Sequence, residues 1–216
     1  ILILSPFITI FYFLRVITGK EDSKRFLEKI SYTNKKKPDN KLVWFHACSV
    51  GETKSIYILV KKFIADNYEV LITTNTRLSS VYVNDNFSKK VYHQYLPLDF
   101  NLFTKRFLRY WNPSMAIFTE SELWPNLINN TCKLNIPLFL VQARISNSSL
   151  RKWKVMGNFL KTTLNNFNLI IAKSDSDKEI MENKIGIKIS GVSDLKFCAP
   201  KLKFDTKNKI LLLEKI

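Results

Sequence analysis

The sequence contains little glycine and little cysteine, and both shortages narrow the range of functions. Five glycines among 216 residues form neither the G-x-G-x-x-G pattern of dinucleotide-binding turns nor a phosphate-binding Walker loop. The three cysteines lie far apart, without a C-x-x-C pair, so their spacing favours neither a metal site nor a disulfide framework. We therefore expect no bound cofactor, no metal ion, and reduced thiols in a cytosolic environment.

Acidic residues are also scarce, because 18 carboxylates face 34 lysines and arginines and leave a net charge of +16. Such an excess predicts an anionic partner or surface. Nucleic acid is one candidate, but the sequence has no nucleic-acid recognition motif, and its basic residues are scattered rather than gathered on one helix. Anionic lipid headgroups or a phosphorylated glycolipid suit the charge equally well, so charge alone decides little.

The N-terminal segment Ile1–Leu14 is uncharged and rich in Ile, Leu and Phe. As a helix it would be about 21 Å long, which is shorter than the roughly 30 Å hydrocarbon core of a bilayer. Basic residues follow at Arg15, Lys20, Lys24 and Arg25, a flank typical of the cytoplasmic side of a membrane. We expect the end of a transmembrane or interfacial anchor, with a buried core helix as the alternative. Because the chain begins with Ile and ends in an apolar run, we also expect a fragment of a longer protein.

Short apolar runs alternate with helical periodicity along the rest of the chain. Strands alternating with helices predict an α/β fold, with a mainly parallel sheet that is covered on both faces. The helical patterns include Leu102–Tyr110, Leu127–Leu134 and Trp153–Phe167. The expected strands are Leu42–Phe45, Val70–Thr73, Val91–Leu96, Ala116–Phe118, Leu138–Val141, Leu169–Ala172 and Ile187–Ile189.

The segment His46–Glu52 follows the first expected strand and precedes a helical pattern. Gly51 is expected to take the backbone angles that a sharp strand-to-helix turn needs. Such a turn places His46, Ser49 and Glu52 at the carboxyl end of a strand, where open α/β sheets bind ligands. The spacing Ser49-x-x-Glu52 also fits a capping box, in which each of the two side chains accepts from the other residue's amide. Spacing alone leaves both interpretations, catalysis and capping, open.

A second motif, Glu120–Asn126, follows the expected strand around Ala116–Phe118. Pro125 suits the first turn of a following helix, and Glu120 is not needed as its cap. Two carboxylates, Glu52 and Glu120, therefore end separate strands at one edge of the sheet. The ends of the other strands add further polar residues to this rim, among them Asp99, Arg144 and Lys173.

These residues resemble a known family. The motifs that carry the resemblance occur in the family's order and spacing, and they are Trp44–Glu52, Tyr95–Asp99, Glu120–Asn126, Ala143–Ser146 and Asp194–Phe197. The chain is similar over about residues 19–205 to the transferases of 3-deoxy-D-manno-octulosonic acid (Kdo), which act in lipopolysaccharide synthesis. The resemblance implies the N-terminal half of a GT-B glycosyltransferase. It divides the chain into an anchor with its basic flank (1–33), a linker (34–40), a Rossmann-like acceptor-binding domain (41–205) and the start of an interdomain linker or second domain (206–216).

The resemblance also implies partners and residue roles. The donor would be CMP-Kdo, bound mainly by a second domain, so this half alone should be inactive, and the acceptor would be a lipid A precursor. The protein would lie at the cytoplasmic face of the inner membrane on anionic lipids, without binding nucleic acid. Glu52 would be the catalytic base, while Glu120 and Lys196 would stabilise the transition state. His46, Ser49, Gly51 and Arg144 would bind substrate, and we interpret Glu122 as structural and Trp124 as packing.

The sequence departs from the family pattern at three places. Gln142 stands where Asn usually precedes Ala-Arg, and Ser193-Asp194 stands where Gly-Asn is common. The segment Glu28–Ser31 replaces an expected Glu-Arg-x-Gly. Two alternatives stay open: a GT-B enzyme with another donor or acceptor, and a non-catalytic module that binds anionic glycolipid or nucleic acid.

Overall fold

A parallel sheet in the order β3-β2-β1-β4-β5-β6-β7 organises the chain. The computed structural model describes residues 22–154 and 157–195. The apolar segment Ile1–Leu14 and the expected site residue Lys196 lie outside the described residues. The strands are β1 (Leu42–His46), β2 (Glu69–Thr74), β3 (Val91–Tyr95), β4 (Met115–Thr119), β5 (Leu138–Ala143), β6 (Leu169–Ala172) and β7 (Gly191–Val192).

The predicted parallel sheet is confirmed, and six of the seven expected strands lie where the apolar runs placed them. The seventh expectation is wrong, since Ile187–Ile189 forms no strand and β7 is Gly191–Val192. Ile187 and Ile189 are buried in the core, and the chain first bonds to β6 when the Ser190 amide donates to the Ile170 carbonyl. An apolar run indicates that a segment is buried, whereas a strand also requires backbone hydrogen bonds to a neighbouring strand.

The helical regions fill the connections between strands. The predicted helix Trp153–Phe167 is wrong, because α7 ends at Lys154 and α8 begins at Phe159. Gly157 lies between them with φ 59°, a left-handed conformation that ends a right-handed helix. The helical elements are η1 (Ser23–Ile30), α2 (Val50–Ser55), α3 (Tyr57–Ala65), α4 (Arg77–Asn86), α5 (Asn101–Trp111), α6 (Pro125–Lys133), α7 (Asn147–Lys154), α8 (Phe159–Leu164), α9 (Asp175–Ile180) and η2 (Met181–Ile185).

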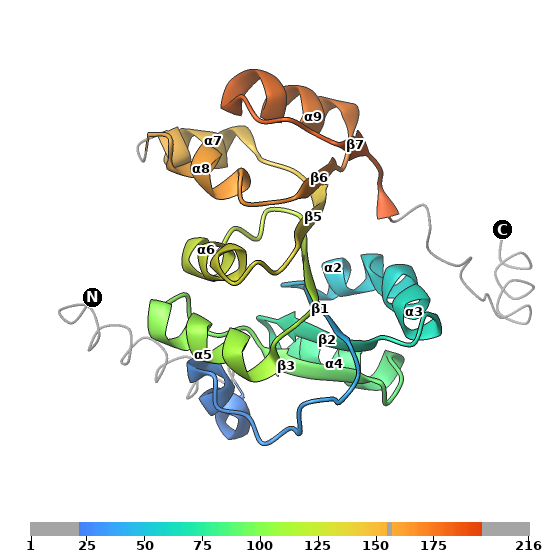
Figure 1. Cartoon of the computed structure of the whole chain (residues 1–216). Helices are drawn as coiled ribbons and strands as arrows, with labels where there is room; N and C mark the ends of the chain where they lie inside the picture. The colour runs from blue at the N-terminus through green and yellow to red at the C-terminus, as the bar shows by residue number, and fades with distance from the viewer. Residues whose placement is uncertain (1–21, 155–156, 196–216) are drawn as a thin grey trace, which may run out of the picture.

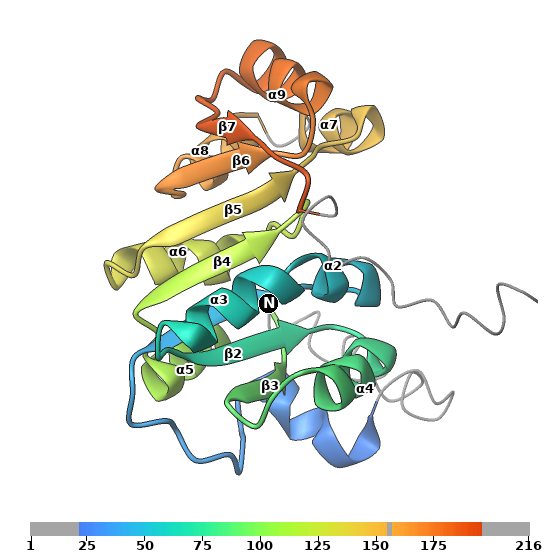
Figure 2. The same cartoon turned by 90° about the vertical axis from the view of Figure 1, so that its right-hand side faces the viewer.

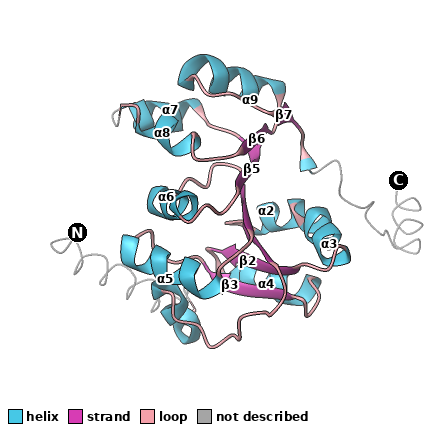
Figure 3. Ribbon diagram, viewed as in Figure 1, coloured by secondary structure: helices cyan, strands magenta, loops and turns pink. Residues whose placement is uncertain are grey.

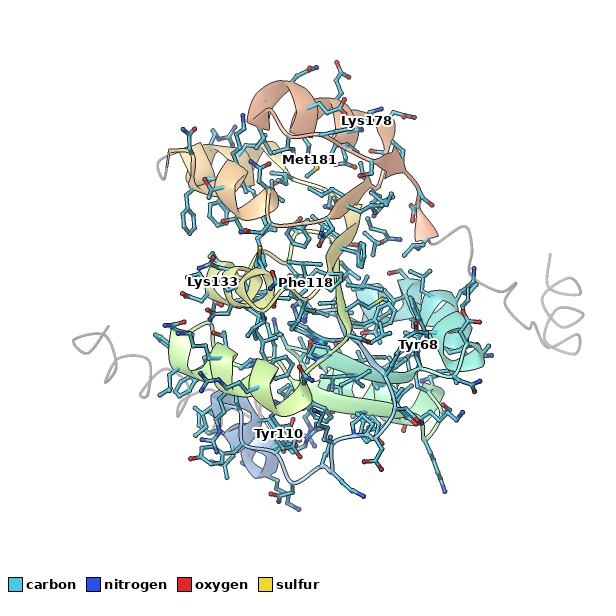
Figure 4. The ribbon with its side chains drawn as sticks, in the orientation of Figure 1. Tyr68, Tyr110, Phe118, Lys133, Lys178 and Met181 are labelled. Carbon is cyan, nitrogen blue, oxygen red and sulfur yellow. The ribbon has the colours of Figure 1, made fainter. Side chains whose placement is uncertain are left out.

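Helices cover both faces of the sheet, as predicted. Helices α2, α3 and α4 lie on one face, and α5, α6, α7 and α8 lie on the other (Figure 1; Figure 3). Successive side chains of β1 point to opposite faces, so Trp44 joins the core with Phe118 while Phe45 joins the core with Ile72. Figure 4 shows Phe118 beside α6 and Tyr68 on the opposite side of the sheet. Both faces of β1 are therefore buried, which explains its unbroken apolar run.

All strands point the same way, so their carboxyl ends form one edge of the sheet (Figure 2). We call this the carboxyl edge. The first turns of α2 and α4 open there, directly after β1 and β2. Within residues 22–154 and 157–195, no helix is long and apolar enough to cross a membrane.

Helix η1 is docked on β3 by the two members of a partly buried ion pair within the helix. The guanidinium of Arg25 donates twice to the Glu28 carboxylate, at 2.8 Å each, and also to the Ser80 hydroxyl. Glu28 in turn accepts from the amide of Tyr95 at the end of β3. Ser31 follows with φ 65°, which explains why the family commonly has glycine there. Its hydroxyl donates to the Phe103 carbonyl, a contact that glycine could not make.

His93 on β3 lies beneath this ion pair. Its Nε2 is 2.9 Å from the Thr74 hydroxyl, and its Nδ1 is 2.8 Å from Arg25, which can only donate. The imidazole is therefore held neutral, with its proton on Nε2. Burial, followed by the positive charges of Arg25, Lys35 and Lys29, holds the pKa of His93 well below 6.5.

Replacing this histidine should remove a pH dependence of stability. The unfolded chain gains a proton on His93 below about pH 6.5, while the native state rejects it, so stability falls by about 1.4 kcal/mol per pH unit. We expect urea unfolding to show wild type losing more stability than His93→Gln between about pH 7.5 and about pH 5.5. The Asp and Glu residues contribute equally to the pH dependence of both proteins, so their contributions cancel in this difference. An equal loss in both proteins would show that His93 is protonated in the native state.

Candidate functional site

The turn after β1 forms the predicted capping box, except that the Glu52 carboxylate accepts from a different backbone amide. The Glu52 amide donates to the Ser49 hydroxyl at 3.3 Å, which caps α2. The Glu52 carboxylate reaches back to the amide of Cys48, at 2.9 Å, rather than to that of Ser49. The Ser49 hydroxyl also donates to the other carboxylate oxygen, at 2.8 Å.

Glu52 has a third donor from a different strand. The hydroxyl of Thr119, at the end of β4, donates to the carboxylate at 2.8 Å, and Glu52 is only 8% exposed. Its carboxylate thus joins the first turn of α2 to the ends of both central strands. These contacts therefore give Glu52 a structural role. Its position at the carboxyl edge is also compatible with a catalytic role.

Gly51 does not play the conformational part expected of it. It lies in the first turn of α2, and the left-handed glycines among the described residues are Gly157 and Gly186. An added Cβ at Gly51 would meet the Ser49 hydroxyl at 3.8 Å, an ordinary contact. The backbone conformation therefore does not require glycine at this position. The lack of a side chain at Gly51 leaves the N-terminal turn of α2 uncovered.

His46 lies beneath the edge and has no exposed surface. Its Nδ1 is 3.1 Å from the Thr73 carbonyl, while its Nε2 accepts from the Trp124 indole at 3.2 Å and lies 3.5 Å from the Glu122 carboxylate. Because His46 is fully buried, the structure does not support the expectation that His46 binds substrate directly. Its contacts instead support the loop between β4 and α6.

Glu122, interpreted from the sequence as structural, is the carboxylate that lies beside Glu52. One oxygen from each of these two glutamates and the Cys48 Sγ lie within 4.8 Å of one another. Burial alone raises the pKa of Glu122, but interactions with His46, Trp124 and Cys48 outweigh burial and lower its pKa below the usual value. Glu122 also accepts from the Trp124 indole at 3.0 Å. The sequence signal for this placement is the Glu-x-Glu spacing after β4, which brings a second carboxylate to the end of that strand.

The donor atoms of Cys48, Glu52 and Glu122 are close enough together to surround an ion, but their chemistry does not favour one. Burial, followed by the negative charge of Glu122, raises the pKa of the Cys48 thiol to about 12. The proton therefore stays on sulfur, whereas a metal ligand must be a thiolate. Glu52 already accepts from three donors. We assign no metal to this group.

Glu120 begins a separate part of the carboxyl edge. It has φ 53°, and its carboxylate lies 4.0 Å from both Arg144 and Lys173. These ion pairs are partly exposed and contribute little to stability. A non-glycine residue in a left-handed conformation at a strand end is typical of a functional position.

Gln142, at the adjacent strand end, has φ 54° and is fully buried. Asn tolerates this left-handed conformation better than Gln does, which explains why the family commonly has Asn there. The Gln142 amide donates to the Asp194 carboxylate at 3.1 Å. Two departures from the family pattern therefore contact each other, and the longer side chain of Gln142 reaches a residue that can only accept.

A pocket of about 570 Å³ opens beside Glu120, between the ends of β5 and β6 and the start of α9. Arg144 and Lys173 lie on its wall with Ser146, Ser174, Asp177 and Asp194. Asp99, also expected on the rim, instead caps α6 by accepting from the amides of Asn126 and Leu127. The structure thus separates the rim into a buried cluster around Glu52 and an open pocket beside Glu120.

A parallel sheet whose carboxyl edge gathers carboxylates and cations is the architecture of an α/β enzyme domain. Residues 24–199 match the family model described as 3-Deoxy-D-manno-octulosonic-acid transferase (kdotransferase). The chain therefore belongs to the Kdo transferase family and is a glycosyltransferase domain of that family.

Individual relatives agree with this assignment. A 3-deoxy-D-manno-octulosonic acid transferase of Rickettsia bellii is 35% identical over 215 residues, which cover 98% of this chain and 51% of the relative. That of Rickettsia prowazekii is 39% identical over 164 residues, covering 74% and 35% respectively. The chain thus spans about half the length of the R. bellii relative. Among solved structures, the Glycyrrhiza uralensis UGT73P12 complex covers 79% of this chain and 51% of its own at 12% identity, with a TM-score of 0.48, a likeness too distant to carry an argument.

Proposed function

We propose that the protein transfers Kdo from CMP-Kdo to a lipid A precursor, and that this chain is the acceptor-side half of a GT-B enzyme. Membership of the Kdo transferase family supports the donor and the lipid acceptor as classes. The observation that carries the proposal is the Glu52 carboxylate, fixed at the carboxyl edge by three donors. A rigidly held carboxylate at an edge where ligands bind suits a general base.

The proposed reaction needs one proton acceptor. The acceptor hydroxyl gives its proton to Glu52 while its oxygen bonds to the anomeric carbon of Kdo. The bond from that carbon to the phosphate oxygen breaks, and CMP leaves with the electron pair without needing an acid. Glu120 and Lys196 are proposed to stabilise charge in this transition state, and Arg144 and Ser49 to contact substrate. Arg144 is suited to an anionic group because a guanidinium binds carboxylate or phosphate in a bidentate manner.

Capping and catalysis by Glu52 can be separated in the full-length enzyme. We expect Glu52→Gln to lower turnover of CMP-Kdo and lipid A precursor by roughly 10²-fold or more. The melting temperature should barely change, because Gln can keep the capping-box contacts. Ser49→Ala is the comparison, since it removes the cap partner of Glu52 and should lower stability by about 1 kcal/mol, while its loss of turnover, from one substrate contact, should be smaller than that of Glu52→Gln. Mass spectrometry of the glycolipid measures both rates.

Wild-type turnover in Glu52→Gln would leave Glu52 as a cap, and the base would have to be sought elsewhere, with Glu120 next. Absence of any Kdo transfer by the wild-type full-length enzyme would instead contradict the proposed donor and acceptor themselves.

We further propose that the protein lies on the cytoplasmic face of the inner membrane. Exposed apolar side chains lie on or next to η1 and on the helices α4 and α5, and they belong to Leu27, Tyr32, Leu78, Val81 and Leu102. Helix η1 contacts α4 through Arg25 and Ser80, and it contacts α5 through Ser31 and Phe103. Lys24, Arg77, Lys105 and Arg106 lie on the same three elements. Such a mixture of apolar and basic side chains suits the interface of an anionic bilayer.

Vesicle cosedimentation tests this membrane surface. Leu78 and Leu102 are 74% and 73% exposed, so we expect Leu78→Ser with Leu102→Ser to weaken binding to anionic vesicles. Added salt should weaken it further, because each basic residue near the surface contributes about 1 kcal/mol. Leu134→Ser is the matched control, an exposed leucine at the far end of α6. Equal binding by both variants, or equal binding to zwitterionic vesicles, would contradict the proposed surface.

A further inference from the structure

Arg144 and Lys173 lie on either side of one carboxylate. The guanidinium of Arg144 is 4.0 Å from one oxygen of Glu120, and the ammonium of Lys173 is 4.0 Å from the other. Both separations exceed hydrogen-bond distance. Neither cation forms a side-chain hydrogen bond with another residue in the part of the chain that the structure describes. Their N–H groups, five on an arginine and three on a lysine, are therefore available to a ligand.

Backbone contacts fix the two cations to the ends of neighbouring strands. Lys173 follows β6, and its amide donates to the Ala143 carbonyl at 3.0 Å. Arg144 follows β5, and its carbonyl accepts from the Ser121 hydroxyl, next to Glu120, at 2.5 Å. These strands pair in parallel and end at the carboxyl edge (Figure 2). The sheet itself thus places the two cations and Glu120, at the ends of β5, β6 and β4.

The pocket beside these residues has a mixed lining that indicates which anion it takes. Its volume of about 570 Å³ falls within the roughly 300–1,000 Å³ of small-molecule sites. Arg144 and Lys173 share its wall with the carboxylates of Asp177 and Asp194. A phosphate monoester, with a charge of about −1.5 to −2, meets more repulsion from these acids and Glu120 than a carboxylate with a single charge does. Because carboxylates also accept hydrogen bonds from hydroxyl groups, the lining suits a sugar acid.

We propose that this pocket binds the sugar acid of the donor, with the carboxylate of the sugar contacting Arg144 and Lys173. The proposal rests on the proposed function, in which the donor is CMP-Kdo. An octulosonic acid of this type carries its carboxylate on the anomeric carbon, so this contact places the reacting carbon beside Glu120. That carbon gains positive charge as its bond to the phosphate oxygen breaks, and a nearby carboxylate stabilises the charge. Lys173 is thereby a specificity-determining residue, which distinguishes a sugar acid from a neutral sugar.

Steady-state kinetics of the full-length enzyme with Lys173→Met test the proposal, because methionine keeps an apolar stem and removes the charge. We expect kcat/KM for CMP-Kdo to fall about tenfold or more, the effect of losing one hydrogen bond between charged groups. The inhibition constant of CMP, which has no sugar acid, and the KM for the lipid A precursor should stay at their wild-type values. The melting temperature should barely change, since a partly exposed ion pair contributes little to stability. Lys173→Arg, which keeps the charge, should retain most of the wild-type kcat/KM.

Lys178→Met is the matched control, because Lys178 lies on α9 outside the lining of the pocket (Figure 4). It should leave all of these constants unchanged. The proposal is overturned if Lys173→Met keeps the wild-type kcat/KM for CMP-Kdo, or if inhibition by CMP weakens by the same factor. A rise in the KM for the lipid A precursor alone would also overturn it, because the bound anion would then be a phosphate of the acceptor.

If Lys173→Met does not fold, Arg144→Met must show the same loss confined to CMP-Kdo, and wild-type kinetics in that variant would overturn the proposal. Absence of Kdo transfer by the wild-type enzyme would contradict the proposed function instead.

Discussion

The carboxylate of Glu52 is the contact on which the arrangement of the site depends. It accepts from the Cys48 amide, the Ser49 hydroxyl and the Thr119 hydroxyl. These donors belong to the turn after β1, the cap of α2 and the end of β4. A buried carboxylate is costly unless it is hydrogen-bonded, so the three segments are held at one spacing. These contacts fix the position of the Glu52 carboxylate at the edge of the sheet, which is what positioning of a reacting group requires.

A layer of buried polar groups below Glu52 extends this constraint across the sheet. The hydroxyl of Thr73 accepts from the Trp44 indole, and His46 bonds to the same threonine. The indole of Trp124 then ties His46 to the loop that carries Glu122. Removing one partner from such a network leaves another polar group buried and unpaired. The polar layer therefore connects β2, β1 and the loop after β4 at the depth where the apolar core ends.

Much of the fold followed from the sequence, because burial on both faces leaves continuous apolar runs for most strands. The errors came where burial and backbone pairing diverge, as at Ile187–Ile189, or where one glycine interrupts a helical pattern, as at Gly157. The capping box and the carboxyl edge were also predictable. The proximity of Glu122 to Glu52 was not, because it depends on the path of the loop from Thr119 to Trp124, which periodicity does not report. Nor could spacing show that Gln142 and Asp194, two departures from the family, contact each other.

We propose that the acceptor hydroxyl meets Glu52 at the carboxyl edge of β1. A crystal structure of the full-length enzyme with an acceptor-sugar analogue bound tests this claim directly. We predict a hydroxyl oxygen within about 3 Å of a Glu52 oxygen, approaching over the uncovered first turn of α2. An analogue bound with its reacting hydroxyl nearest Glu120, while Glu52 keeps its three donors and touches no ligand, would show that Glu52 is not the base.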